Sequence, residues 1–221
     1  MTLKYNKVLI INPAKVASAS FYHGLKNKYH CFHGHNLDYL KQEINNNSNN
    51  LIICGVRNPI TRNESYFFQT KKDDYFNDFK TSKNNYEGEY CYIDPNKDLM
   101  TSFNNFKYKY TYLEWLDEFI NITEIKEYNH QRGFQIYGIK NNNTLLVYTF
   151  EKLTQNKKVF EDLLNFKIEN RNVNNGLDYL KFRCKVIYKK DYLDRLLFNK
   201  TMNFFYSKKD IDLFYNNAFS T

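Results

Sequence analysis

The sequence predicts an α/β fold with a mainly parallel central sheet flanked by helices. Two runs of consecutive apolar residues, 7–12 (KVLIIN) and 51–56 (LIICGV), are short and rich in β-branched side chains, as buried parallel strands are. Segments with helical periodicity follow both runs, and this alternation is typical of the class. Such sheets bind ligands beyond the carboxyl ends of their strands, so the loops after Asn12 and Val56 are the places to look for a site.

In the first 69 residues, strands and helices are expected to alternate three times. A loop of small residues separates the first strand from the first helix, and Pro59 suits the first turn of the third helix. The expected strands are 7–12, 29–32 and 51–56, and the expected helices are 18–28, 36–44 and 59–69.

We expect one domain that spans residues 1–221. The chain has 42% apolar residues, which is enough for a sizeable core, and it contains no internal repeat. From residue 70 to 110 the pattern becomes polar and loses any sustained period. We interpret this stretch as an irregular insertion in the single domain.

Beyond the insertion the pattern becomes regular again. Thr111 with Glu114, and Ser207 with Asp210, have the spacing of a capping box and predict that a helix begins at each pair. Thr154 is expected to cap another helix. The elements predicted here are a helix from 111, a strand over 143–150, and helices over 154–164, 191–205 and from 207 onward.

Composition and charge narrow the class of partner. The formal charge of +8 suits an anion, whether nucleic acid, anionic lipid or a phosphorylated or sulfated small molecule. No run of five or six Lys or Arg exists, so we expect no nucleic-acid partner. No apolar stretch approaches 18 residues and no secretory signal is visible, so we expect no membrane span and a cytoplasmic location. Four separated cysteines without a CxxC pair fit reduced thiols there.

A loop of small residues, NPAKVASASF, occupies residues 12–21. Its small side chains leave backbone N–H groups open to an anion, and the N-terminus of the following helix adds partial positive charge. Lys15 supplies a full charge, while Ser18 and Ser20 supply hydroxyl donors. The order GxxxxGK[ST] is missing, which disfavours an ordinary NTPase phosphate loop. Taken alone, the loop fits a tightly packed strand-to-helix turn equally well.

A second candidate anion site lies in GVRNPITRNES, residues 55–65. Arg57 stands at the end of the expected buried strand, and Ser65 follows eight residues later, about two turns into the helix. Arginine binds phosphate bidentately, and a nearby hydroxyl can complete the phosphate site. The alternative is that Arg57 forms a structural ion pair and Ser65 faces solvent.

Two histidines alternate in CFHGHN, residues 31–36. A neutral imidazole at His33 or His35 can remove the proton of a hydroxyl as a general base. The alternatives are two surface histidines, or a zinc site completed by His23 or His30. No carboxylate or thiol has the spacing of a metal motif, so we expect no metal.

In their order and spacing, these three motifs resemble those of the sulfotransferase superfamily. NPAKVASASF is similar to its 5′-phosphosulfate loop, and VRNPITRNES is similar to its 3′-phosphate element, in which a serine follows the arginine by eight residues. FHGH is similar to the histidine segment of the carbohydrate 2-O-sulfotransferases, about 22 residues before that arginine; His35 precedes Arg57 by 22. The ending FYSKKDIDLFYNNAF resembles a group of capsular polysaccharide synthesis proteins.

The resemblance implies a P-loop-like sulfotransferase architecture. It also implies transfer of a sulfuryl group from 3′-phosphoadenosine 5′-phosphosulfate (PAPS) to a hydroxyl, which we expect on a sugar or glycan. His35 would take the acceptor proton, His33 would orient the acceptor or support His35, and Lys15 would stabilise charge on the departing phosphate. The residues implied in cofactor binding are Lys15, Val16, Ala17, Ser18, Ala19, Ser20, Arg57 and Ser65.

Three residues depart from the family pattern. Ala14 separates the proline from the lysine, Ala19 stands where a threonine hydroxyl is usual, and Asn58 replaces the common aspartate. One alternative is therefore a catalytically degenerate module that binds a nucleotide or glycan without turnover. Another is a kinase-like nucleotide enzyme, which the missing Walker order and the lack of an obvious Mg²⁺ carboxylate disfavour.

Overall fold

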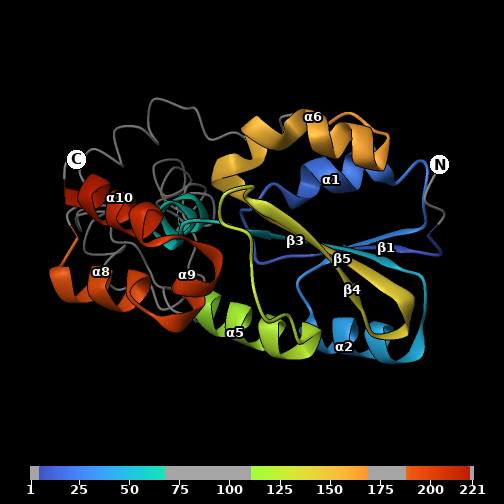
Figure 1. The fold of residues 1–221 in the computed structure, drawn as a ribbon, viewed down its shortest axis with the longest axis horizontal. Coiled ribbons are helices and arrows are strands. Elements are labelled where there is room, and N and C mark those ends of the chain that lie inside the picture. Colours follow the sequence, from blue (N-terminus) through green and yellow to red (C-terminus); the bar gives the residue numbers. More distant parts are fainter. Residues whose placement is uncertain (1–4, 68–110, 169–187, 220–221) are drawn as a thin grey trace, which may run out of the picture.

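The computed structural model describes residues 5–67, 111–168 and 188–219. Their strands form one mixed, mostly parallel sheet in the order β2-β1-β3-β5-β4, with helices on both faces (Figure 1), so the predicted α/β class is confirmed. The expected insertion at 70–110 lies outside the described residues. The strands are β1 (Val8–Ile11), β2 (Cys31–Gly34), β3 (Leu51–Val56), β4 (Phe134–Ile139) and β5 (Asn143–Thr149).

Each face of the sheet carries its own apolar layer. Side chains of β1 alternate between the two layers: Val8 and Ile10 pack with α1 and α6, while Leu9 and Ile11 pack with α2 and α5. Both layers exclude water from the central strands, which explains their unbroken apolar runs. These helices are α1 (Ser18–Leu25), α6 (Leu153–Leu164), α2 (Leu37–Asn46) and α5 (Thr111–Thr123).

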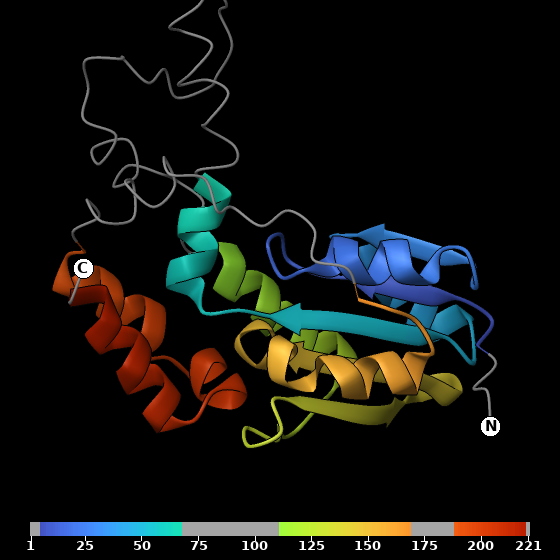
Figure 2. The ribbon, with the colours of Figure 1, turned by 90° about the horizontal axis from the view of Figure 1, so that it is seen from above.

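The remaining helices lie beyond the carboxyl end of β3 (Figure 2). A helix over residues 59–67 follows β3 directly. Two short 3₁₀ turns precede and follow β5, namely η1 (Lys140–Asn142) and η2 (Phe150–Lys152). The C-terminal helices are α8 (Lys190–Leu197), α9 (Lys200–Phe205) and α10 (Lys208–Phe219). No helix among residues 5–67, 111–168 and 188–219 has the length and apolar character needed to cross a bilayer.

The topology creates a switch point beside β1. β1 pairs in parallel with β2 on one side and with β3 on the other, and β3 pairs in parallel with β5. The chain therefore leaves β1 toward one edge, through α1 to β2, and returns across it through α2 to β3. In open α/β sheets, a crevice at such a point is where ligands bind.

The strands show where local patterns succeed. β1, β3 and β5 lie where the apolar runs predict them, and β2 begins two residues later than expected. β4 was not predicted: it is an antiparallel edge strand whose residues are all partly or fully exposed. An edge strand with this mixed exposure leaves no continuous apolar run to recognise.

The helix starts give a mixed outcome. The Ser207–Asp210 capping box is confirmed, because the Ser207 hydroxyl accepts from the Asp210 N–H at 3.2 Å and the Asp210 carboxylate accepts from the Ser207 N–H at 3.1 Å. α5 begins at Thr111, as predicted. The cap at Thr154 was wrong, because η2 runs directly into α6, whose N-cap residue is Lys152.

The single helix predicted over 191–205 is two helices. Phe198 leaves the helical conformation with ψ at 69°, which ends α8. The Asn199 side chain then accepts a hydrogen bond from the Met202 N–H at 3.0 Å and caps α9. Asparagine is a strong N-cap residue, so the break has a local cause that the apolar periodicity does not reveal.

Candidate functional site

The three predicted motifs meet at the carboxyl ends of β2, β1 and β3, where the fully buried Asn12 joins them. Its N–H donates to the Gly34 carbonyl at 3.1 Å, and its carbonyl accepts from His35 Nδ1. Its side chain donates to the Ile53 carbonyl at 3.3 Å and accepts from the Gly55 N–H. Asn12 therefore fixes the strand ends that carry the motifs. The sequence analysis assigned it no role; the available signal was an amide that closes an apolar run.

The loop after Asn12 has an unusual backbone conformation. Lys15 and Ala17 both have left-handed backbone conformations, with φ of 74° and 63°, although neither is glycine. Ala17 is the N-cap residue of α1 and provides no side-chain cap. Within the described residues, nothing accepts from the N–H groups of residues 16–19. Turns of this kind at a helix N-terminus form anion-binding concavities.

The side chains of this loop take different parts. Val16 is fully buried, and its carbonyl accepts from the Tyr148 hydroxyl, so only its N–H is available to a ligand. Ser18 lies within 2.8 Å of His33 Nε2. Ser20 is also buried, and its N–H donates to the Ala17 carbonyl at 3.0 Å. The loop therefore offers an anion mainly its backbone, with Ser18 as the hydroxyl that also meets a histidine.

Positive charge gathers around the same loop. Burial of the half-buried Lys15 side chain, together with the charges of Arg57 and Arg62, lowers the pKa of Lys15 to about 8. The side chain is therefore still mostly an ammonium at pH 7. Among the residues that the structure describes, no carboxylate forms an ion pair with any of these three cations. The carboxylate of Glu151 interacts with Arg57 without reaching ion-pair distance, so three cations share one acid, and the net positive charge favours an anionic ligand.

Arg57 is held at the end of β3. Its Nη1 donates to the Lys15 carbonyl at 3.0 Å and its Nε donates to Thr61 Oγ1 at 3.3 Å. The guanidinium lies over the Phe150 ring, 4.5 Å from the centroid. The ion pair considered from the sequence is therefore not formed with any described residue. Nη2 remains as the group that can meet a ligand.

Ser65 lies in the helix over residues 59–67, one turn beyond Thr61 and therefore on the same face. It is only 6% exposed, so the alternative in which it faces solvent is wrong. The Arg57 side chain contacts Thr61 rather than Ser65. Thr61 is thus a candidate that the sequence analysis missed, although its spacing of four from both residues was available.

Asn58 keeps the capping function that an aspartate would have there. Its side chain accepts from the Ile60 N–H at 2.9 Å, which satisfies the first turn of the helix over 59–67. Its own N–H donates to the Glu151 carboxylate at 2.7 Å, and the second oxygen of Glu151 accepts from the Tyr206 hydroxyl at 2.8 Å. The departure at position 58 therefore preserves the local structure.

Arg62 is a second arginine of the site that the sequence analysis did not select. Only 6% of it is exposed, and its Nε donates to the Ala14 carbonyl at 3.3 Å. Its guanidinium lies 4.6 and 5.1 Å from the ring centroids of Tyr66 and Tyr112, and burial lowers its pKa. The Tyr112 hydroxyl accepts from the Arg57 N–H and donates to the Arg57 carbonyl, both at 2.8 Å. Arg62 and Tyr112 therefore brace the loop and the strand end.

The two histidines differ in their surroundings. His33 is partly buried and stacks on Tyr22 at 5.4 Å between ring centroids. Burial, and then the neighbouring His35 and His23, lower its pKa, so His33 is neutral at pH 7. His35 is exposed, and its ring centroid lies 6.2 Å from that of His33. The pair thus combines a supporting ring with an accessible one.

The hydrogen bond of His35 defines its chemistry. A carbonyl can only accept, so Nδ1, which faces the Asn12 carbonyl, carries the proton. In the neutral ring, Nε2 is then the unprotonated nitrogen, and it can accept a proton from a hydroxyl. Within the described parts of the chain, no three His, Cys, Asp or Glu side chains gather as metal ligands do.

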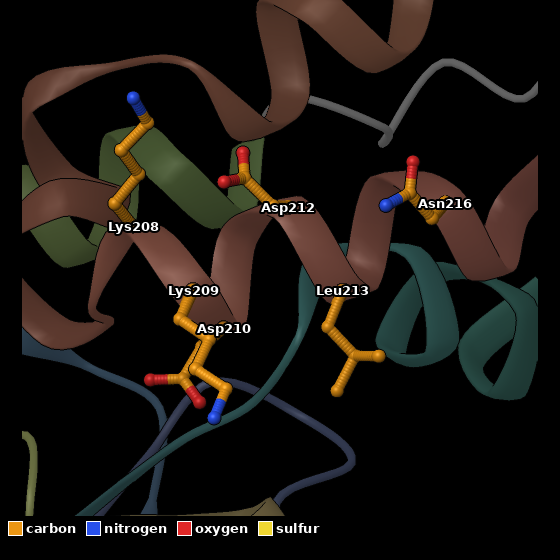
Figure 3. Close-up of a pocket in the computed structure, with 6 residues that line it drawn as sticks. All are labelled: Lys208, Lys209, Asp210, Asp212, Leu213 and Asn216. Carbon is orange, nitrogen blue, oxygen red and sulfur yellow. The ribbon is translucent and has the colours of Figure 1, made fainter.

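A hollow of about 530 Å³ lies elsewhere, along α10 (Figure 3). It contains none of the residues that the sequence motifs select. The hollow is lined by Lys208, Lys209, Asp210, Asp212, Leu213 and Asn216.

Comparison of the chain with protein-family models, curated proteins and solved structures gave no match. The resemblance to sulfotransferases therefore rests on the sequence motifs alone.

Proposed function

We propose that the protein transfers a sulfuryl group from PAPS to the hydroxyl of a sugar or glycan. One observation supports this most: three motifs that are separate in sequence converge on a single switch point, where Lys15, Arg57 and Arg62 form no ion pair with any carboxylate of the described residues. The loop N–H groups and Lys15 would hold the 5′-phosphosulfate, and Arg57 with the helix over 59–67 would hold the 3′-phosphate. This arrangement is the P-loop-like architecture that we assign to the site.

His35 Nε2 would accept the proton of the acceptor hydroxyl as its oxygen bonds to sulfur. The bond between sulfur and the bridging phosphate oxygen breaks in the same displacement, and adenosine 3′,5′-bisphosphate departs. Lys15 and the loop N–H groups would stabilise the negative charge that develops on that phosphate. PAPS supplies the activated sulfuryl group, and His33 would support His35 and position Ser18.

A catalytically degenerate binding module is the second candidate. It is favoured by the engagement of Ser18 with His33 at 2.8 Å, combined with the lack of a hydroxyl at Ala19. The loop then has fewer side-chain donors for a sulfuryl group than the family pattern has. Such a module would bind the nucleotide without turnover.

Isothermal titration combined with a radiolabelled sulfate transfer assay separates these functions. If the site binds the 3′-phosphate, adenosine 3′,5′-bisphosphate should bind roughly tenfold to a hundredfold more tightly than AMP. This ratio corresponds to the free energy of one charge-assisted hydrogen bond. Binding of the bisphosphate without transfer to any glycan would favour the degenerate module. Equal affinities for AMP and the bisphosphate would remove the donor assignment, and a preference for ATP would favour the kinase-like alternative.

A further inference from the structure

Trp115, the only tryptophan of the chain, stands beside the proposed base. It lies on α5, and its indole Nε1 donates to the backbone carbonyl of His35 at 2.9 Å. The two residues are 80 positions apart, so the fold brings them together. This hydrogen bond therefore holds Trp115 next to the backbone of His35.

One face of the indole is covered and the residue remains partly exposed. The ring stacks on Phe119, with 5.5 Å between centroids and 9° between planes, and Phe119 is fully buried. Packing on Phe119 and the hydrogen bond to His35 fix the ring in two ways. A fixed aromatic ring loses little conformational entropy when a ligand stacks on it.

We propose that Trp115 is the stacking platform for a sugar ring of the acceptor. This inference rests on the proposed function, because it names the part of the same site that receives the acceptor. A pyranose has an apolar face of C–H groups and a rim of hydroxyls, and the indole is a broad apolar surface anchored by one polar atom. A sugar stacked there would place a rim hydroxyl next to His35.

The charges on α5 favour an uncharged sugar as the acceptor. α5 carries Glu114, Asp117 and Glu118 and has no Lys or Arg. Asp117 accepts a hydrogen bond from Thr201, whereas Glu114 and Glu118 are exposed on either side of Trp115 in the sequence. Their field opposes a sulfated or uronate-containing chain but leaves a neutral one unaffected. The donor side is cationic, so the two substrates would be sorted by charge.

The sole tryptophan makes the test direct, because all indole fluorescence comes from position 115. Full-length protein is first screened on an array of uncharged hexasaccharides (maltose, cellulose, chitin and mannan series) and of heparin and chondroitin sulfate hexasaccharides. The strongest uncharged hexasaccharide is then titrated while indole emission is recorded. We expect a saturable change in emission with that probe and none with the anionic ones. Preferential binding of the anionic probes, binding without an emission change, or no uncharged hexasaccharide bound would each overturn the proposal.

Variants separate stacking from general structure. Trp115→Ala is expected to weaken binding of that hexasaccharide roughly two- to tenfold, as loss of an aromatic contact does, while Trp115→Phe retains most of the affinity. In the transfer assay, Trp115→Ala should raise the acceptor KM and leave the donor KM unchanged. The control is Phe198→Ala, which removes an exposed aromatic side chain from the C-terminal end of α8. Equal loss in Phe198→Ala and Trp115→Ala would contradict a specific platform.

The outcomes also distinguish this inference from the proposed function. If the protein binds the bisphosphate and transfers sulfate but the indole emission does not change with the hexasaccharide, the stacking platform is wrong and the sulfotransferase proposal is retained. If the emission changes with the hexasaccharide but the bisphosphate binds no more tightly than AMP, the sulfotransferase proposal is wrong and Trp115 is retained as a sugar-stacking residue. Emission that responds to the bisphosphate alone would assign the ring to the nucleotide base and overturn the platform.

Discussion

Two lysines at opposite ends of β1 show how differently the two ends of the parallel strands are built. We call these ends the amino edge and the carboxyl edge of the sheet. Lys7, just before the strand, donates to the Glu43 carboxylate at 2.8 Å and to the Tyr39 hydroxyl at 3.2 Å, and the hydrogen bond with Glu43 raises its pKa. Lys15, just after the strand, has no acid beside it in the described structure, and burial with two neighbouring arginines lowers its pKa to about 8. The same side chain is compensated at one edge and uncompensated at the other.

The proposed function assigns folding to the amino edge and binding to the carboxyl edge. An ion pair satisfied at the amino edge stabilises the fold and leaves no charge for a ligand. Uncompensated charge at the carboxyl edge destabilises the free protein and is relieved when an anion binds. Left-handed residues occur at both edges, namely Lys15 and Ala17 at the carboxyl edge and Asn49, Asn141 and Asn142 at the amino edge. Asparagine tolerates this conformation better than lysine or alanine does.

The largest effect is expected for His35→Ala, which tests whether the carboxyl edge performs chemistry or only binds. Removal of the general base should lower transfer by about 10²–10⁴-fold and leave bisphosphate affinity nearly intact, as measured by the radiolabel assay and by titration. His33→Ala should show a smaller loss. His30→Ala, which removes an exposed histidine just before β2, should keep wild-type turnover. Wild-type turnover in His35→Ala would remove His35 from the mechanism.

The next largest effect concerns the ligand preference of the same edge. Arg57→Ala should collapse the preference for bisphosphate over AMP, a loss of roughly tenfold to a hundredfold, because Nη2 no longer reaches the 3′-phosphate. Arg57→Lys should restore it only in part, since an ammonium lacks the planar fork, and Ser65→Ala should reduce it modestly. Arg132→Ala removes an exposed arginine elsewhere and should have no effect. A preference that survives in Arg57→Ala would assign the discrimination to other residues.

Lys7→Met tests the amino edge. Only 8% of the Glu43 side chain is exposed. Without the Lys7 ammonium, its carboxylate keeps the hydrogen bond from the Asn47 side chain. A weakly solvated carboxylate without its cation should cost about 1–3 kcal/mol, or a fall in Tm of about 2–10 °C in thermal unfolding. The double variant Lys7→Met/Glu43→Leu should recover part of the loss. An unchanged Tm in Lys7→Met would mean that this edge is not held by the pair.

The sequence predicted the scaffold well because its signals are local. β1 and β3 are buried on both faces, so their residues form unbroken apolar runs, and the Ser207–Asp210 cap acts over three residues. The edge strand β4 and the break at Asn199 lack such signals. The missed strand lies at an exposed edge of the sheet, and the missed helix break depends on a single N-cap residue.

The sequence predicted that the motif residues would lie close together, but not the contacts that hold them in place. Lys15, Arg57 and the two histidines stand in recognisable motifs, and parallel strands bring such motifs together at one edge. Tyr112 clamps Arg57 from 55 positions away, and Trp115 reaches His35 from 80. These contacts depend on where α5 packs, which no local pattern specifies.

The smallest effect has the opposite sign to that of Lys7→Met and therefore tests the comparison most directly. Lys15→Met should weaken bisphosphate binding yet raise the Tm of the free protein by about 1–3 °C at pH 7, since it removes a half-buried charge that solvent only partly screens. The pKa of Lys15 in the folded protein is about 8, below its ordinary 10.5, so the destabilisation is full below pH 8 and disappears as the pH rises toward 10.5. The Tm difference between Lys15→Met and wild type should accordingly shrink between pH 7 and pH 10. The contribution of Lys7, whose pKa is raised, should persist over that range until the pH passes 10.5.

Both lysines have the same neutral replacement, and methionine relieves none of the backbone strain at position 15. A lower Tm for Lys15→Met at pH 7, or a difference that does not change with pH, would show that the charge at the carboxyl edge is compensated after all.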